Sequence, residues 1–230
     1  MTAHYHHMSK SAASAQPILP AYDASLYQHK VYRKLGKRLL DVTLVMMAAP
    51  VIVLVVGLLA ILVALDGGRP FYVQERIGRN GRVYRMWKLR SMVADADERL
   101  EDYLAKDPNA RAEWDSTQKL KSDPRITAFG RFLRKSSMDE LPQLWNVLKG
   151  DMSLVGPRPM MVNQQDLYPG ADYYHLRPGI TGSWQVSARN ESTFADRARF
   201  DAQYNRDLSM MTDLRLILAT VRVVLRATGH

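Results

Sequence analysis

The 230-residue sequence contains no cysteine, which excludes disulfide bonds, thiolate nucleophiles and cysteine-ligated zinc sites. It has no internal repeat, and it lacks an apolar run at its start that could act as a signal peptide, because the first long run begins only at Leu39. His4, His6 and His7 cluster in a polar, irregular stretch, which favours a frayed tail over a metal site. The length allows one domain with a core and is too short for two large ones.

Acidic residues are outnumbered, with 32 Lys and Arg against 23 Asp and Glu and a formal net charge of +9. A strongly basic chain favours nucleic acid, anionic lipid or phosphorylated small molecules as partners. The basic residues are not tied to aromatic or recognition-helix signals. We therefore expect no nucleic-acid partner.

Residues 39–65 form the long apolar run, whose only charge is Asp41. The run is long enough to span a bilayer, but Pro50 interrupts it and lacks a backbone N–H. Basic residues lie on both sides of the run, and such residues stay on the cytoplasmic side. A re-entrant helix that is broken at Pro50 satisfies both flanks, whereas a kinked spanning helix is the alternative. The flanking residues are Lys30, Arg33, Lys34, Lys37 and Arg38 before the run, and Arg69, Arg76, Arg79, Arg82 and Arg85 after it.

Residues 71–92 predict a strand, a turn and a second strand, with Asn80-Gly81 as the hairpin turn. Lys88 and Arg90 are two positions apart and are expected on one face of the second strand. They are either a solvated charged edge or phosphate contacts. Residues 93–120 are acidic and then mixed, which indicates a solvated helix or an insertion without a chemical role.

The stretch from Arg134 to Pro159 is the most informative part of the sequence. Leu141, Leu144, Trp145 and Leu148 recur with helical spacing. Pro142 is tolerated in a first turn, so we expect a helix that begins near Asp139 and ends at Gly150.

Asp139 and Glu140 have two interpretations. Carboxylates at a helix start are ordinary caps, and Ser137 with Glu140 even matches a capping box. However, Arg134, Lys135 and Arg158 crowd this pair, and a helix start beside fixed arginines is also a phosphate site.

The run Ser-x-Asp-Glu-Leu-Pro-Gln-Leu-x-Asn-Val-Leu-x-Gly-Asp-Met-Ser-Leu-Val-Gly-Pro-Arg-Pro, from Ser137 to Pro159, resembles the signature of the bacterial sugar transferases. These monotopic phosphoglycosyl transferases begin exopolysaccharide and other glycan assembly on polyprenol phosphate. Weaker similarity extends from about Lys37 to Gly229. Members of the family break a re-entrant helix at a proline motif that is usually Ser-Pro, where this sequence has Ala49-Pro50.

The resemblance implies an α/β, mostly helical, membrane-associated fold with a re-entrant Pro-broken helix, a small β-hairpin and amphipathic interfacial helices. We expect a flexible cytosolic tail at 1–30, the re-entrant membrane helix at 31–66 and a cytosolic catalytic domain on the membrane at 67–230. The large spanning region that precedes this domain in bigger family members is not expected here. Residues 214–225 are apolar and carry arginines on one face, which suits either a membrane surface or the domain's own core.

The resemblance also implies a reaction: transfer of a hexose-1-phosphate from a UDP-sugar, glucose or galactose, to undecaprenyl phosphate, with release of UMP. Asp139 would be the nucleophile, Glu140 the Mg²⁺ ligand, and Arg134 and Arg158 the groups that stabilise transition-state charge. Asp201 and Tyr204 match family positions, although structural roles suit them equally. Further candidate substrate contacts are Lys88, Arg90, Arg177, Gln185 and Arg189.

The expected location is the cytoplasmic face of the bacterial inner membrane, with membrane lipid as a partner and a homodimer left open. Two alternatives remain, a membrane-anchored glycosyltransferase that releases UDP and a non-catalytic membrane scaffold.

Overall fold

The computed structural model describes residues 30–65, 67–93, 95–117, 120, 122–187 and 193–225. This part of the chain is predominantly helical, as expected, with two small two-stranded sheets. The predicted tail lies outside the described residues, apart from Lys30. In chain order the elements are η2 (Tyr32–Gly36), α1 (Lys37–Leu65), β1 (Phe71–Ile77), η3 (Arg79–Gly81), β2 (Val83–Leu89), α2 (Ala96–Lys106), α3 (Pro108–Thr117), α4 (Ala128–Lys135), η4 (Met138–Glu140), α5 (Gln143–Lys149), β3 (Ser153–Val155), η5 (Val162–Leu167), α6 (Asp172–His175), β4 (Gly179–Thr181), α7 (Ser183–Ser187), α8 (Arg197–Asp207) and α9 (Met210–Leu225).

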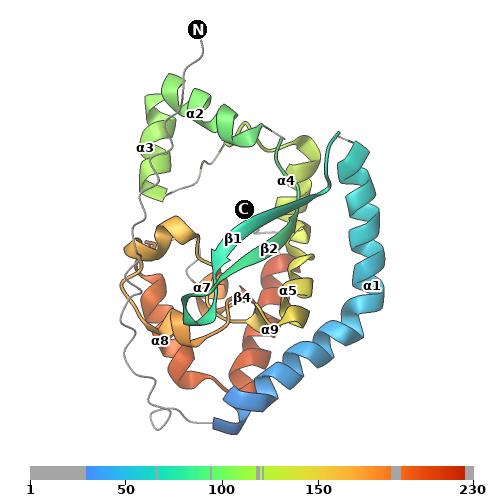
Figure 1. Cartoon of the computed structure of the whole chain (residues 1–230), viewed down its shortest axis with the longest axis vertical. Helices are drawn as coiled ribbons and strands as arrows, with labels where there is room; N and C mark the ends of the chain where they lie inside the picture. The colour runs from blue at the N-terminus through green and yellow to red at the C-terminus, as the bar shows by residue number, and fades with distance from the viewer. Residues whose placement is uncertain are drawn as a thin grey trace.

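Helix α1 is continuous through Pro50 and is bent, where the sequence predicted a break. Figure 1 shows the helix changing direction near its middle as it runs along one edge of the molecule. A proline inside a helix removes one backbone hydrogen bond and crowds the preceding turn, which accounts for a bend without ending the helix. The helix is long and apolar enough to cross a membrane by length and composition.

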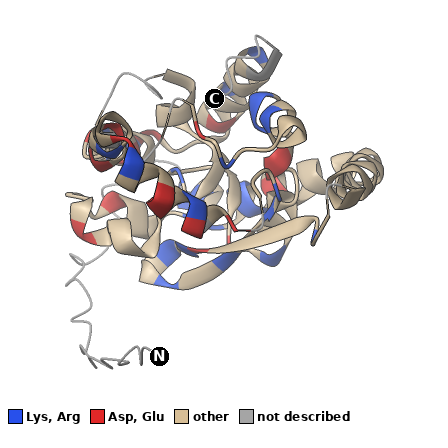
Figure 2. Ribbon diagram, turned by 90° about the horizontal axis from the view of Figure 1, so that it is seen from above, with Lys and Arg blue, Asp and Glu red and all other residues tan. Residues whose placement is uncertain are grey.

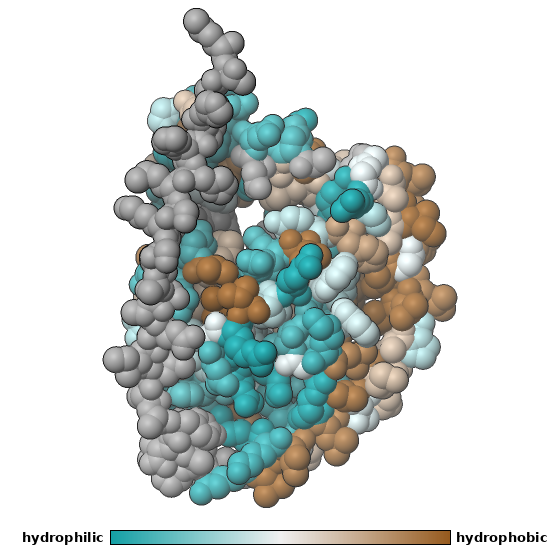
Figure 3. All heavy atoms as spheres, in the orientation of Figure 1, coloured by the Kyte–Doolittle hydropathy of each residue, from teal (hydrophilic) through white to brown (hydrophobic). Residues whose placement is uncertain are grey.

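Only a narrow stripe of α1 packs on the rest of the protein. Val45 lies in a core cluster with β2 and α5, while Leu59 and Val63 pack against Leu89 and Leu133. Most of its other apolar side chains are exposed. Figure 3 shows the resulting apolar surface along the edge that α1 follows, and in Figure 2 the part of α1 seen end-on at the right carries no charge. The exposed residues include Met47, Val51, Val53, Leu54, Leu58, Ile61 and Leu65.

Buried polar contacts fix the first turns of α1 to the domain. Lys37 Nζ donates to Asp213 Oδ2 at 2.8 Å and to Tyr204 OH at 2.9 Å. Asp41 accepts hydrogen bonds from Ser153 Oγ at 2.7 Å and from the backbone N–H of Leu154 at 3.0 Å. Buried charges are tolerated only when they are paired, so separating these groups would be costly. The contacts therefore hold the first turns of α1 in one orientation relative to the domain.

The predicted hairpin is confirmed. β1 and β2 pair antiparallel from Phe71↔Leu89 to Ile77↔Val83, and Asn80 and Gly81 lie in the turn with φ of 59° and 75°. The sequence did not predict the short parallel pair of β3 and β4. That pair packs the turn after Val155 against the segment around Gly179. The two segments are so close that a Cβ on Gly156 would lie 2.3 Å from Arg177 O.

The acidic stretch forms two helices where one was predicted. Asp107 separates α2 from α3, and its Oδ1 accepts the backbone N–H groups of Asn109 and Ala110. The pair has its own small core around Leu100 and Leu104 and stands apart from the rest of the domain (Figure 1).

The C-terminal helix α9 was expected to pack either on a membrane surface or on the domain's own core, and it has a face that suits each interpretation. Asp213 is buried, and Leu216 and Ile217 pack on the core. On another face Leu218 and Val221 are exposed, as are Arg215 and Arg222.

Candidate active site

The central motif turns sharply before its helix. Ser137 has a φ of 57°, and Met138–Glu140 form a single 3-10 turn. Helix α5 begins at Gln143, with Pro142 as its N-cap, so the prediction of a helix start near Asp139 was wrong. The capping box is not formed either, because the Ser137 side chain makes no cap hydrogen bond. The end of the helix was predicted correctly, since Gly150 has a φ of 89° and its N–H donates to Asn146 O and Val147 O.

Asn146 fixes α5 to β2. This side chain is fully buried and accepts the backbone N–H of Trp87 at 3.0 Å, while its Nδ2 donates to Arg85 O at 2.8 Å. Trp145, which belongs to the predicted apolar face, is instead 58% exposed. The buried side of α5 is therefore partly polar, and this places the 3-10 turn beside β2.

Asp139 is buried, with 6% of its surface exposed. Burial raises the pKa of its carboxyl group, and the negative charge of Glu140 raises it further. Lys88 and Arg134 act in the opposite direction, with Lys88 Nζ 4.0 Å from Asp139 Oδ2. A carboxylate placed this way is poorly solvated and faces two cations, which suits a nucleophile.

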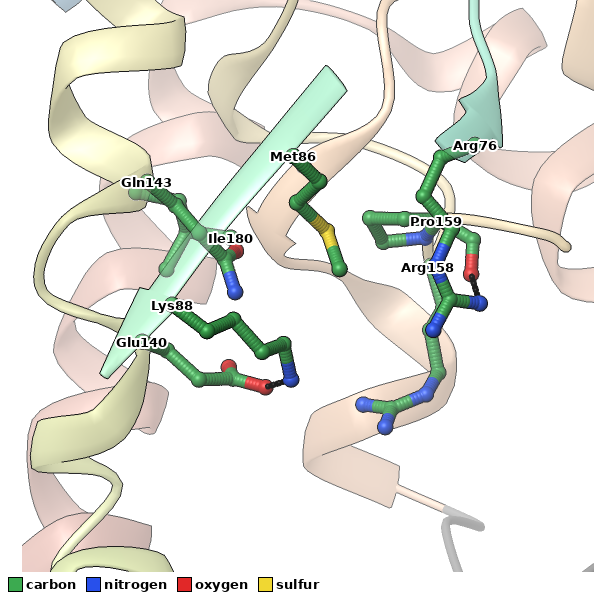
Figure 4. A pocket seen from close by; sticks show the side chains of 9 residues that line it. Arg76, Met86, Lys88, Glu140, Gln143, Arg158, Pro159 and Ile180 are labelled. Carbon is green, nitrogen blue, oxygen red and sulfur yellow. Dashed lines mark hydrogen bonds and ion pairs between the residues drawn. The ribbon is translucent and has the colours of Figure 1, made fainter. Parts of the chain in front are cut away.

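Glu140 forms the edge of a pocket. Its Oε1 lies 2.9 Å from Lys88 Nζ, and about a quarter of the Glu140 side chain is exposed. Figure 4 shows Lys88 and Glu140 on one side of this pocket and Arg158 and Arg76 on the other.

Arg134 is positioned from α4. Its Nε donates to Ser91 Oγ at 2.9 Å. A close backbone contact supports this placement, because a Cβ on Gly130 would lie only 2.0 Å from Ser91 O. Burial lowers the pKa of Arg134, and the nearby Asp139 partly offsets this.

Arg158 is held by the turn between β3 and η5. Its guanidinium carbon lies 5.8 Å from the centre of the Trp184 ring. The side chain projects into the same hollow as Lys88 (Figure 4). Thus five of the predicted residues, Lys88, Arg134, Asp139, Glu140 and Arg158, meet around one site.

The remaining predicted contacts lie elsewhere or are not described. Arg90 follows the end of β2 and donates to Val63 O of α1 at 3.0 Å. Arg177 donates to Gly150 O at 2.9 Å. Gln185 in α7 has both amide atoms buried, with no hydrogen-bond partner in the described part of the chain. Arg189 lies outside the described residues. Asp201 and Tyr204 make buried structural contacts, with Tyr168 OH and Asp213 Oδ1 respectively.

Sequence reasoning missed three residues. Arg76 and Gln143 line the pocket, and Arg197 stacks on Trp184, 4.3 Å from the ring centre. Hairpin register could have identified Arg76, because Arg76 pairs with Tyr84, and Tyr84, Met86 and Lys88 share a face. The sequence carries no comparable signal for Gln143 or Arg197.

The described residues contain no group of three or more His, Asp or Glu side chains suited to a metal ion. Mg²⁺ is commonly held by one or two carboxylates together with substrate phosphate and water. The adjacent Asp139 and Glu140 fit that limited requirement, with Glu140 the more accessible of the two.

The site therefore combines a buried carboxylate, a second carboxylate at the pocket edge and several cations that face the same hollow. Such a set can stabilise phosphate charge and attack a phosphorus atom. It lies beside an apolar helix that exposes most of its surface.

Comparison with known proteins agrees with this chemistry. The family profile "Bacterial sugar transferase" matches residues 32–227. A "UDP-galactose-lipid carrier transferase" of Erwinia amylovora is 50% identical over 174 residues, which are 75% of this chain and 36% of that protein. An "Undecaprenyl-phosphate galactose phosphotransferase" of Salmonella typhimurium is 50% identical over 73% of this chain and 36% of its own length.

A relative of similar size is also known. The "Exopolysaccharide production protein ExoY" of Sinorhizobium fredii is 40% identical over 85% of this chain and 88% of its own length. The chain thus spans little more than a third of the first two relatives and most of the third. The profile match covers most of the sequence and includes the whole site, and the chain belongs to the bacterial sugar transferase family.

Proposed function

We propose that this protein transfers a hexose-1-phosphate from a UDP-sugar to undecaprenyl phosphate and releases UMP, the first membrane step of exopolysaccharide or related glycan assembly. The observation that carries the proposal is the burial of Asp139 near the cations Lys88 and Arg134. Lys88 also lines the adjacent pocket, together with Glu140 and Arg158. The names of two relatives refer to UDP-galactose and to undecaprenyl phosphate, which supports these substrate classes. Either galactose or glucose fits the proposal.

The reaction would proceed by double displacement. An Asp139 carboxylate oxygen attacks the β-phosphorus of the UDP-sugar, the bond from that phosphorus to the bridging oxygen breaks, and UMP leaves with that oxygen. The sugar phosphate is then an acyl phosphate ester on Asp139. An oxygen of undecaprenyl phosphate attacks the same phosphorus, which forms the lipid diphosphosugar and returns Asp139 as a carboxylate.

The surrounding residues supply charge and orientation. Lys88 and Arg134 favour the ionised form of Asp139 against its burial. Arg158 stabilises the charge that develops on the phosphate oxygens. Glu140 would hold Mg²⁺, which offsets the diphosphate charge when bound.

The second substrate is a membrane lipid, and α1 provides the means to reach it. Its exposed apolar surface would lie in the cytoplasmic leaflet of the inner membrane, and the bend at Pro50 would return it to the same side. Residues 31–66 would then be the re-entrant anchor and 67–230 the catalytic domain at the surface.

Product analysis tests the proposal. The detergent-purified protein is mixed with UDP-galactose or UDP-glucose, Mg²⁺ and undecaprenyl phosphate, and the nucleotide and lipid products are identified. We expect UMP and a lipid-linked diphosphosugar, with both lost in Asp139→Asn. Release of UDP would indicate simple glycosyl transfer, and no turnover with any donor would favour a scaffold.

A further inference from the structure

Three arginines from distant parts of the chain meet beside the pocket. Arg76 comes from β1, Arg158 from the turn after β3, and Arg197 from the start of α8. Arg158 and Arg76 line the pocket together. Arg158 and Arg197 both lie over the Trp184 ring, at 5.8 Å and 4.3 Å from its centre. Arg158 is therefore the link between the other two.

This cluster has little opposing charge. Within the described part of the chain, none of the three guanidinium groups forms an ion pair with a carboxylate within 4.0 Å. Burial raises the pKa of the nearby Asp201 to about 7, so near neutral pH this group supplies only part of a negative charge to Arg197. Burial, and then the charge of Arg158, lower the pKa of Arg76 and of Arg197 to about 10.

Two donors of the cluster are also unsatisfied, although the other two nitrogens of Arg76 donate to Pro159 O and Gln74 Oε1. Among the described residues, the Nε atoms of Arg76 and Arg197 are buried without a hydrogen-bond partner. Buried donors are almost always paired in native structures. Like charges that are held together with unpaired donors indicate that an anion belongs between them.

We propose that Arg76, Arg158 and Arg197 form a second phosphate subsite, next to the Lys88–Glu140 pocket, that holds the nucleotide phosphate of the donor. The identity of the ligand rests on the proposed function. Arg158 would contact both phosphates of the diphosphate, with the β-phosphate toward Asp139 and the α-phosphate toward Arg197. After the first displacement UMP would remain on this subsite until it dissociates.

The position of the cluster favours the nucleotide over the lipid phosphate. Apart from the hydrogen bond between Lys37, at the start of α1, and Tyr204 of α8, helix α8 packs on α6 and α7, whereas α1 packs on α5, β2 and β3. In Figure 1, α8 lies on one side of the hairpin and the part of α1 beyond its bend lies on the other. A lipid phosphate that arrives along α1 would meet Lys88 and Glu140 first.

Binding measurements on the purified full chain test this subsite. Isothermal titration calorimetry at fixed salt compares UMP, inorganic pyrophosphate and detergent-dispersed undecaprenyl phosphate. We expect Arg197→Gln to weaken UMP and pyrophosphate binding about tenfold or more, the usual effect of losing a charge-assisted hydrogen bond. Undecaprenyl phosphate binding should be unchanged. Arg199→Gln, which changes an exposed arginine on the same helix, should change none of the three.

Two results would overturn the proposal: unchanged UMP and pyrophosphate binding in Arg197→Gln, or a matching loss for undecaprenyl phosphate. If Arg197→Gln does not fold, Arg76→Gln serves in its place, with the same expected losses. The outcome is separate from that of the reaction. An enzyme that released UDP would refute the Asp139 mechanism, whereas pyrophosphate binding through Arg197 would still hold.

Discussion

Replacing Lys88 by methionine removes the cation that lies 4.0 Å from Asp139 Oδ2. At this distance a unit charge contributes about 1 kcal/mol in water and about 4 kcal/mol at an effective dielectric constant of 20. Loss of this stabilisation of the carboxylate should raise the pKa of Asp139. The upper part of this energy range is favoured because Asp139 is buried and because Glu140 loses its ion pair with Lys88.

The direction of the effect on activity follows from the proposed mechanism. Asp139 attacks only as a carboxylate, so activity falls as the pH drops through its pKa. Since Lys88→Met raises that pKa, the acid limb of the profile should move to higher pH. The assay is UMP release, measured as kcat/KM between pH 5 and pH 9, with that range chosen to include an ordinary and a raised carboxyl pKa.

A matched control is available on α5. Lys149 forms a 2.9 Å ion pair with Asp151, and 44% of its side chain is exposed. Lys149→Met should leave the acid limb in place. If Lys88→Met lowered activity equally at every pH without moving the limb, Lys88 would bind substrate only, and the account of how Asp139 stays ionised would be refuted.

Four further predictions concern the scaffold and the membrane helix. Asn146→Ala empties a fully buried position and removes the partners of the Trp87 N–H and of Arg85 O. It should destabilise the protein by about 2–4 kcal/mol in denaturant unfolding; an unchanged midpoint would contradict this. Gly130→Ala places a Cβ 2.0 Å from Ser91 O, so it should reduce activity through Arg134, whereas Gly57→Ala, which has nothing within 4 Å, should not. Burial raises the pKa of Asp201 from 3.8 to about 7. Between these pH values the folded state binds more protons than the unfolded state, so the free energy of unfolding should fall as the pH rises. In thermal unfolding, Asp201→Asn should make this fall smaller. Because the chain has no cysteine, Lys34→Cys and Arg69→Cys each give a single labelling site, one on either side of the apolar run. If the helix is re-entrant, an impermeant maleimide should label both sites from the cytoplasmic side only. Labelling of the two sites from opposite sides would show a spanning helix.

Short-range sequence patterns correctly predicted the hairpin and the end of α5. The Asn80-Gly81 turn fixed the hairpin because both residues adopt positive φ readily. Gly150 ended α5 for the same reason. The start of α5 was misplaced because the positive φ of Ser137, a residue that rarely adopts it, redirects the chain into a 3-10 turn.

Charge in the sequence indicated the chemistry but not the full site. Asp139 and Glu140 stood out because they lie together among arginines. Arg76 and Arg197 are ordinary surface residues by sequence, and they join the site only because β1 and α8 fold back toward the Arg158 turn. By its spacing Arg90 was expected on the same strand face as Lys88. However, β2 ends at Leu89, and the Arg90 side chain donates a hydrogen bond to Val63 O of α1 instead.

The sequence by itself determined the family, the apolar helix, the hairpin and the central carboxylate pair. Each of these depends on residues close together in the chain, whose spacing is visible directly. Only the tertiary structure decided that α1 bends without breaking and that Lys88 and Arg134 approach Asp139 from β2 and α4. It also decided that Arg76 and Arg158 line one pocket, with Arg197 beside Arg158 on the Trp184 ring. These features arise from packing between segments that are far apart in the sequence. The burial of a side chain and the pairing of its charge depend on such contacts, which local sequence patterns do not reveal.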